Sequence, residues 1–201
     1  MTAAPVFTFN EASHEYRVDG VVYPSITQVI ESAGLVDYSH IPADELKFFQ
    51  DRGTGVHRAC WFDDDNDLDE ATVDPLIIFR LYAWRKFRQE MPFTVVKSEE
   101  RGFDRIYGFA GTPDRLVAFP DARRAVIELK SGPIQAAAAI QTAAQAHLLS
   151  PGSPERYRRF AVHLRGDGSY SVKEFCQSQA RQDLSIFLCA LNLHLWKRGH
   201  L

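Results

Sequence analysis

The sequence is poor in cysteine and has no long hydrophobic run. Its 201 residues include three cysteines, which lie far apart at positions 60, 176 and 189. An odd, scattered set argues against a disulfide framework and against a four-cysteine zinc or iron–sulfur site. No stretch approaches the roughly 20 apolar residues of a membrane span, and the first residues lack the basic-then-apolar order of a signal peptide. We therefore expect a protein without membrane contact that works in a reducing cytoplasm.

The chain also lacks an excess of positive charge. Its formal net charge is −3, with 23 basic and 26 acidic side chains. Six of the acidic residues lie in the run 63–70 (DDDNDLDE). Outside this run the chain has 23 basic and 20 acidic side chains (26 minus 6). The balance excludes an overtly basic protein that coats nucleic acid, but it leaves room for a local basic groove. We expect the run itself to be an exposed, mobile loop.

The sequence has no internal repeat, no low-complexity linker and no glycine-rich phosphate loop of the GxxxxGK type. Its length suits one domain, which we expect to span 1–201. Within that domain we distinguish N-terminal strands and helices at 1–92, a central part at 93–150, and a C-terminal hairpin and helix at 151–201.

The pattern of apolar and turn-forming residues predicts how helices and strands alternate. Short strands joined by turns come first, and Ser25 is placed to cap the helix that follows them. Further helices are expected at 26–33, 43–52, 55–62, 75–91, 134–149 and from 178 or 179 onward, and strands at 93–96, 106–109, 115–119, 125–130, 157–164 and 170–175. This order predicts an α/β fold, specifically an α/β/α sandwich with a mixed central β-sheet.

Charged residues within the central strands form the most informative pattern. The run 111–114 (Gly-Thr-Pro-Asp) breaks a strand and places Asp114 at its end, and the apolar strand that follows contains Glu128 and Lys130. Side chains two residues apart on a strand share a face. A hairpin would bring Asp114 to the same strand end. Because buried unpaired charges are costly, two carboxylates and a lysine placed together there indicate a site.

Two carboxylates favour binding of a hard cation, either Mg²⁺ or Mn²⁺. Such an ion polarises a phosphate oxygen and activates water, and a nearby lysine offsets charge in the transition state. The alternative is a surface Glu–Lys pair on an edge strand with an unrelated turn aspartate. The whole spacing, with an alanine-rich helix after it, favours the site.

These residues resemble the PD-(D/E)xK nuclease superfamily, in particular its RecB-like and phage-type exonuclease branch. Pro113-Asp114 matches the PD element, and the run 128–130 (Glu-Leu-Lys) matches the ExK element. The resemblance implies a restriction-endonuclease-like core in which Asp114, Glu128 and the carbonyl of Leu129 bind metal and Lys130 serves the water and the scissile phosphate. It further implies that His57, in a glycine-then-histidine motif, is another metal ligand, which suits Mn²⁺ more than Mg²⁺.

The resemblance also points to residues around these motifs. Gln141 matches a glutamine on the helix after the ExK strand, whereas Gln145 stands where the family usually has a tyrosine. We take Gln141, Ser131 and Arg52 as candidate nucleic-acid contacts, with an ordinary solvated side chain as the alternative for either glutamine. Glu99 and Glu100 compete for an acidic position before the first core strands. The spacing to the next aromatic residue favours Glu100, so Glu100 and Gln145 are accessory candidates. For both glutamates, however, a solvated charge pair is the favoured interpretation.

Basic side chains also gather in two places that could follow a phosphate backbone. They are Arg80, Arg85, Lys86 and Arg88, with Trp84 among them, and Arg156, Arg158 and Arg159. A solvated helix face is the alternative for each.

The resemblance implies a metal-dependent exonuclease that cleaves DNA in phage or prophage recombination or repair. The setting would be the cytoplasm of a bacterial cell or phage-infected host, with DNA and a single-strand annealing protein as the implied partners. Three other interpretations stay open: a structure-selective endonuclease, a non-catalytic nucleic-acid-binding or structural module on the same fold, and a hydrolase of small phosphorylated molecules. The three cysteines exclude relatives that carry an iron–sulfur cluster. Oligomeric state is not readable from the sequence.

Overall fold

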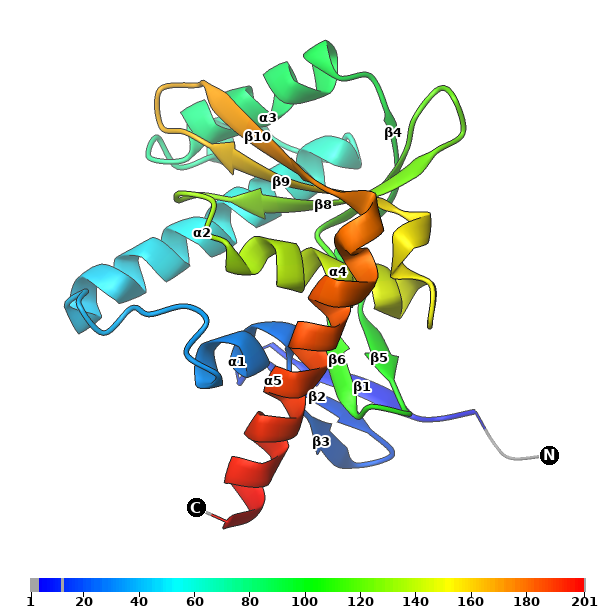
Figure 1. The fold of residues 1–201 in the computed structure, drawn as a ribbon. Coiled ribbons are helices and arrows are strands. Elements are labelled where there is room, and N and C mark those ends of the chain that lie inside the picture. Colours follow the sequence, from blue (N-terminus) through cyan, green and yellow to red (C-terminus); the bar gives the residue numbers. More distant parts are fainter. Residues whose placement is uncertain (1–3, 12, 201) are drawn as a thin grey trace.

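The strand β8 (Arg124–Lys130) lies at the centre of a five-stranded sheet in the computed structural model, which describes residues 4–11 and 13–200. The strand order is β10-β9-β8-β7-β4, and Figure 1 shows helices on both faces. The other strands of this sheet are β4 (Thr94–Ser98), β7 (Arg115–Ala118), β9 (Arg158–Leu164) and β10 (Tyr170–Phe175). Strands β8 and β9 run parallel, and the other neighbours are antiparallel. The mixed sheet and its helical layers confirm the predicted α/β fold.

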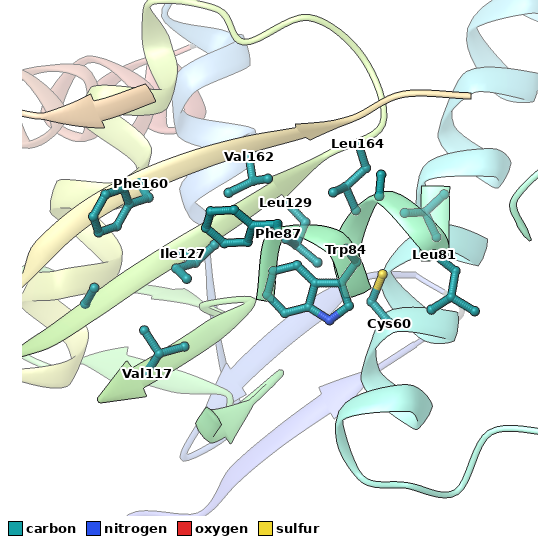
Figure 2. Close-up of a cluster of buried hydrophobic side chains, with 13 residues drawn as sticks. Cys60, Leu81, Trp84, Phe87, Val117, Ile127, Leu129, Phe160, Val162 and Leu164 are labelled. Atoms are coloured by element: carbon teal, nitrogen blue, oxygen red, sulfur yellow. The ribbon is translucent and has the colours of Figure 1, made fainter. Parts of the chain in front are cut away.

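Helices α2 (Ala43–Asp64) and α3 (Ile78–Glu90) cover one face of this sheet. Figure 2 shows the side chains between them, where Trp84 and Phe87 of α3 pack against apolar residues of β7, β8 and β9. Trp84 is completely buried, because every second residue of the central strands is apolar and faces these helices. Trp84 is therefore a core residue and cannot stack on a base.

Helices α4 (Ala137–Leu149) and α5 (Ala180–His200) lie on the opposite face. The small alanine side chains of α4 let that helix approach the sheet closely, and Ala138 packs against Ala161 and Phe175. Helix α4 also connects β8 to its parallel neighbour β9, as a parallel crossover requires.

A further layer, built from N-terminal residues and one ribbon from the middle of the chain, packs against α4 and α5. It contains a sheet of β1 (Phe7–Asn10), β2 (Glu15–Val18) and β3 (Val21–Tyr23), helix α1 (Ile26–Ser32), and a ribbon of β5 (Gly102–Asp104) and β6 (Phe109–Gly111). The predicted Ser25 cap is confirmed, because its hydroxyl accepts a hydrogen bond from the Gln28 amide at 3.1 Å. Short 3₁₀ turns at Glu70–Thr72, Pro154–Arg156 and Gln177–Gln179 complete the chain.

Two predicted boundaries were wrong. Helix α2 continues through Gly53 and Gly55 instead of dividing into two helices. A β-carbon on Gly55 would lie only 2.9 Å from the side chain of Ile77, so the glycine permits close packing that compensates for its low helix propensity. The strand expected at 106–109 begins only at Phe109, because a carboxylate oxygen of Asp104 accepts hydrogen bonds from the next amides and holds a turn.

Candidate metal centre

The antiparallel pairing of β7 and β8 brings Asp114 next to the ExK residues. Arg115 lies opposite Ile127 in the register, so the residue before β7 meets the C-terminal end of β8. Asp114 is buried, and its Oδ2 accepts a hydrogen bond of 2.7 Å from the Leu129 amide. The strand break before Asp114 is anchored by Thr112, whose hydroxyl lies 2.7 Å from the Tyr16 hydroxyl.

Helix α2 supplies His57 to the same strand end. The His57 Nε2 atom lies 3.1 Å from the Leu129 carbonyl oxygen, and its Nδ1 atom lies 3.4 Å from Asp114 Oδ1. The structure therefore brings together three of the four predicted metal ligands: the imidazole, the aspartate and the main-chain carbonyl.

Glu99 joins this group, and Glu100 does not. Glu99 Oε1 lies 3.6 Å from His57 Nδ1, and one ligand atom each from His57, Glu99 and Asp114 lies within 4.8 Å of the others. The Glu100 side chain instead pairs with Lys97 at the surface. The preference for Glu100 was wrong because the backbone of Glu99 is left-handed (φ 50°) and its amide bonds to the Asp114 carbonyl. A backbone turn of this kind leaves no clear sequence signal.

Glu128 lies outside this three-residue group and is held by α4. Gln141 donates to Glu128 Oε1 at 2.7 Å, and Gln145 donates to Oε2 at 2.6 Å. Lys130 donates to the same Oε1 at 2.9 Å and to the Gln141 side-chain oxygen at 2.8 Å. The two glutamines lie one helical turn apart, so both reach the carboxylate from one face of α4.

These contacts change the interpretation of the glutamines. Gln145 is 2 % exposed, so it cannot contact DNA as an accessory residue, and it orients Glu128 instead. Gln141 is partly exposed and bridges Glu128 and Lys130. The pattern of two glutamines one turn apart was visible in the sequence, but their shared partner was not.

Charge and burial set the protonation of the site. Burial alone would lower the pKa of His57, but the carboxylates of Asp114 and Glu99 outweigh it and raise that pKa well above 6.5. Burial raises the pKa of Glu128, and the charge of Asp114 adds to this effect. Burial would also lower the pKa of Lys130, yet the Glu128 carboxylate raises it, so Lys130 is a cation at neutral pH.

The donor set fits Mn²⁺ or Mg²⁺. His57, Glu99 and Asp114 offer one nitrogen and two carboxylates close together, and the Leu129 carbonyl lies at the other ring nitrogen of His57. Hard divalent cations prefer carboxylate and carbonyl oxygens, and an imidazole shifts the preference toward Mn²⁺. The raised pKa of His57 has the same origin, since clustered carboxylates attract positive charge.

A buried ion pair behind the centre was missed by sequence reasoning. Arg115 follows Asp114 directly and is fully buried, and its guanidinium binds Asp64 and donates to Glu99 Oε1 at 3.0 Å. Asp64 also accepts a hydrogen bond of 2.9 Å from the Trp84 indole. The sequence does not distinguish Asp64 as a buried partner of Arg115, because Asp64 is one of six acidic residues in the run 63–70.

The acidic run is only in part the exposed loop that was expected: Asp65, Asp67, Asp69 and Glu70 are exposed, but its first residues are not. Its first two residues complete α2, and Asp63 lies 2.7 Å from Arg85 and 3.4 Å from Arg88. Glu70, at its other end, binds Arg85 at 2.6 Å. The same contacts occupy two of the arginines considered for DNA.

The second basic group is mostly occupied as well. Arg159 is fully buried against Asp183 at 2.8 Å, and Arg158 binds Glu174 at 2.7 Å. Opposite charges on neighbouring elements explain both contacts, which sequence spacing alone does not reveal.

Arg52 and Ser131, the other two candidate nucleic-acid contacts, lie next to each other. Arg52 donates a hydrogen bond of 3.2 Å to the Ser131 carbonyl, directly after the ExK strand. Its guanidinium also lies 4.9 Å from the centre of the Phe49 ring.

The sequence was compared with known protein families and with curated proteins. No protein-family description matches the sequence, and no curated protein matches it. Within residues 4–11 and 13–200, no helix combines the length and apolar character needed to cross a membrane.

Proposed function

We propose that the protein is a divalent-metal-dependent DNA nuclease of the PD-(D/E)xK type, and that it acts as an exonuclease. One observation carries the proposal. His57, Asp114 and the Leu129 carbonyl meet at the end of β8, with a lysine of the same strand bound to a buried glutamate beside them. A surface Glu–Lys pair would need neither the burial nor the convergence of α2, β7 and β8.

The side chains have separate roles in this proposal. His57, Glu99 and Asp114 would hold Mg²⁺ or Mn²⁺. The resemblance adds the Leu129 carbonyl and Glu128 as further ligands. When bound, the ion would polarise a phosphate oxygen and lower the pKa of water. Lys130 is positively charged, so it would orient the attacking water and offset negative charge on the phosphate rather than accept a proton. Gln141 and Gln145 fix the position of Glu128.

The products would be a 5′-phosphate and a 3′-hydroxyl. The biological setting would be phage or prophage recombination or repair in the bacterial cytoplasm, beside a single-strand annealing protein. The glycine-then-histidine motif that includes His57 favours an exonuclease over a sequence-specific endonuclease, through the resemblance to the RecB-like branch.

The test uses linear and closed circular DNA with Mg²⁺, Mn²⁺ or EDTA. We expect metal-dependent loss of linear DNA only. Nicking of the circle would move the proposal to an endonuclease, and binding without cleavage under every condition would refute a nuclease.

Matched variants connect the activity to this site. Glu99→Gln and Lys130→Ala should each lower the cleavage rate by about 100-fold or more, as loss of a transition-state contact does. Glu100→Gln and Lys97→Ala are the controls, since these two neighbours pair with each other at the surface. Equal activity of Glu99→Gln and Glu100→Gln would remove Glu99 from the centre.

A further inference from the structure

A second group of basic side chains, three arginines and a histidine, lies beyond the C-terminal ends of the parallel strands β8 and β9. It consists of Arg52 of α2, Arg80 of α3, His163 of β9 and Arg165 of the following turn, here called the arginine cluster. His163 pairs with Lys130 in the β8–β9 register. The cluster is thus one strand away from the lysine of the candidate metal centre. Ligands commonly bind beyond the carboxyl ends of parallel strands, where the connections diverge.

Two contacts place Arg52 and Arg80 against the segments that follow β8 and β9. Arg52 reaches across to the Ser131 carbonyl at 3.2 Å. Arg80 lies over the turn after β9, where a β-carbon on Gly166 would be 3.2 Å from its Nη1 atom. The mutual effect of the charges agrees with this geometry, because burial and then Arg165, Arg80 and Arg52 lower the pKa of His163.

The three arginines have no carboxylate partner among the described residues. Their hydrogen bonds go to neutral oxygens: Arg52 to Ser131, Arg80 to the Leu76 carbonyl at 2.9 Å, and Arg165 to the Ser169 hydroxyl at 3.2 Å and the Tyr170 carbonyl at 3.3 Å. The nearby Asp167 carboxylate instead accepts bonds from Ser169. This differs from Arg85, Arg115 and Arg159, each of which binds an acidic side chain.

Two of these guanidinium groups also have unused donors. The Nε atoms of Arg52 and Arg80 are buried and have no hydrogen-bond partner. Buried polar atoms are normally paired, so an unpaired donor calls for an explanation such as an absent ion. The three guanidinium groups are partly buried, and the Asp167 carboxylate acts on Arg165 through its charge alone, without an ion pair. Like charges held in this way favour an anion, and guanidinium groups match phosphate oxygens particularly well.

We propose that Arg52, Arg80, Arg165 and His163 form a phosphate-binding subsite that holds a phosphate of the DNA strand beside the one being cleaved. This inference rests on the proposed nuclease function for the identity of its ligand. A phosphodiester and a terminal phosphate share the chemistry that the cluster recognises. Engagement of one phosphate here would position the neighbouring one near Lys130.

The first experiment measures the subsite without DNA or cleavage. Thermal unfolding of the full chain in EDTA is followed with increasing inorganic phosphate, at constant ionic strength set with chloride. Phosphate should raise the melting temperature of the wild type, and Arg80→Gln or Arg165→Gln should remove most of that increase. The control Arg124→Gln removes an exposed charge from the opposite end of β8 and should retain it. The lysine variant Arg80→Lys keeps the charge and should retain part of the response.

The second experiment measures binding of a short DNA duplex in EDTA. Each glutamine variant should weaken binding about tenfold and reduce the salt dependence by roughly one phosphate contact. Duplexes with a 5′-phosphate or a 5′-hydroxyl separate the two sources. If the variants lose affinity only for the duplex with a 5′-phosphate, the ligand is a terminal phosphate. If they lose equal affinity for both duplexes, the ligand is an internal phosphodiester.

The outcomes separate the subsite from the nuclease proposal. One outcome is that the glutamine variants respond to phosphate and bind DNA as the wild type does. If the wild-type protein also cleaves DNA, that result overturns the subsite and leaves the nuclease proposal in place. Phosphate protection that depends on Arg80 and Arg165 in a protein that cleaves no DNA would support an anion site and overturn the nuclease.

Discussion

At the scale of single residues, Arg115 joins the candidate centre to the core. It is fully buried, follows Asp114 in the chain and contacts both Asp64 and Glu99. Its guanidinium also lies 5.9 Å from the centre of the Trp84 ring. The residues that hold Glu99 and Asp114 are thus part of the packing between the sheet and α3, so the centre and the fold depend on the same side chains.

Removal of the Asp64 charge should destabilise the protein strongly. Asp64→Asn leaves the buried Arg115 with Glu99 alone of its two carboxylate partners, and breaking a buried ion pair costs about 3–5 kcal/mol of unfolding free energy. Asp67→Asn changes an exposed acid of the same run and should alter stability by less than about 0.5 kcal/mol. Urea unfolding of the two variants checks this. Similar midpoints for both would mean that the Asp64 contact contributes little.

The sequence was informative about the residues of the site because each carries its own signal. Asp114, Glu128 and Lys130 are charges in apolar strands, and His57 lies in a recognisable glycine-containing motif. Glu99 carried no such signal, since its position depends on a left-handed backbone. The partners of Asp64 and Arg159 also depend on which elements pack together, and composition alone does not show this.

At the scale of elements, glycines determine how closely neighbouring helices and loops pack. The predicted division of α2 into two helices failed for this reason. A glycine in a helical pattern predicts a break, yet α2 continues through two of them because Gly55 faces Ile77. The long amphipathic or apolar segments, such as α3, α4, β8 and β9, were predictable to within a few residues. Their ends were less so, because side chains such as Asp104 close turns that mimic strands.

The ribbon of β5 and β6 offers a matched pair of glycines for a test. Gly102 and Gly111 lie opposite each other. A β-carbon on Gly111 would be 2.6 Å from Ile26 Cδ1, whereas one on Gly102 would meet nothing closer than 3.5 Å.

Gly111→Ala should therefore lower the unfolding free energy by about 1–3 kcal/mol, as overpacking does, and Gly102→Ala should have a much smaller effect. Thermal denaturation of both variants measures the difference. Because Gly111 is followed by the turn that places Asp114, cleavage by Gly111→Ala should fall as well. A fully active and stable Gly111→Ala would show that Ile26 moves aside without cost.

At the scale of the whole molecule, the distribution of charge matters more than its total. The net charge of −3 argues against tight binding of DNA by electrostatics alone. Asp63, Asp64 and Glu70 of the run at 63–70 neutralise arginines of α3 and β7, so these three carboxylates do not add to a free negative surface. The arginine cluster remains as the unpaired positive charge beside the candidate centre.

We expect DNA binding to be weak in EDTA and to depend on salt. A few phosphate contacts give a slope of log affinity against log salt of roughly −2 to −3. Addition of Mn²⁺ should strengthen binding, because a bound cation offsets the carboxylates where a phosphate must approach. Fluorescence anisotropy with a non-cleavable duplex measures this, and Asp114→Asn should abolish the response to metal. Tight binding in EDTA that ignores salt would contradict the proposed interface.

The parallel pairing of β8 and β9 has a consequence for the newly made chain. All the proposed ligands lie before Arg158, where β9 begins, but β8 becomes a central strand only when β9 has been added. Parallel pairs need a crossover and form long-range contacts, which makes them slow to fold. A chain still being synthesised that has not yet reached β9 would therefore contain every proposed metal ligand without the framework that positions them, so the candidate centre would form only after β9 has paired with β8.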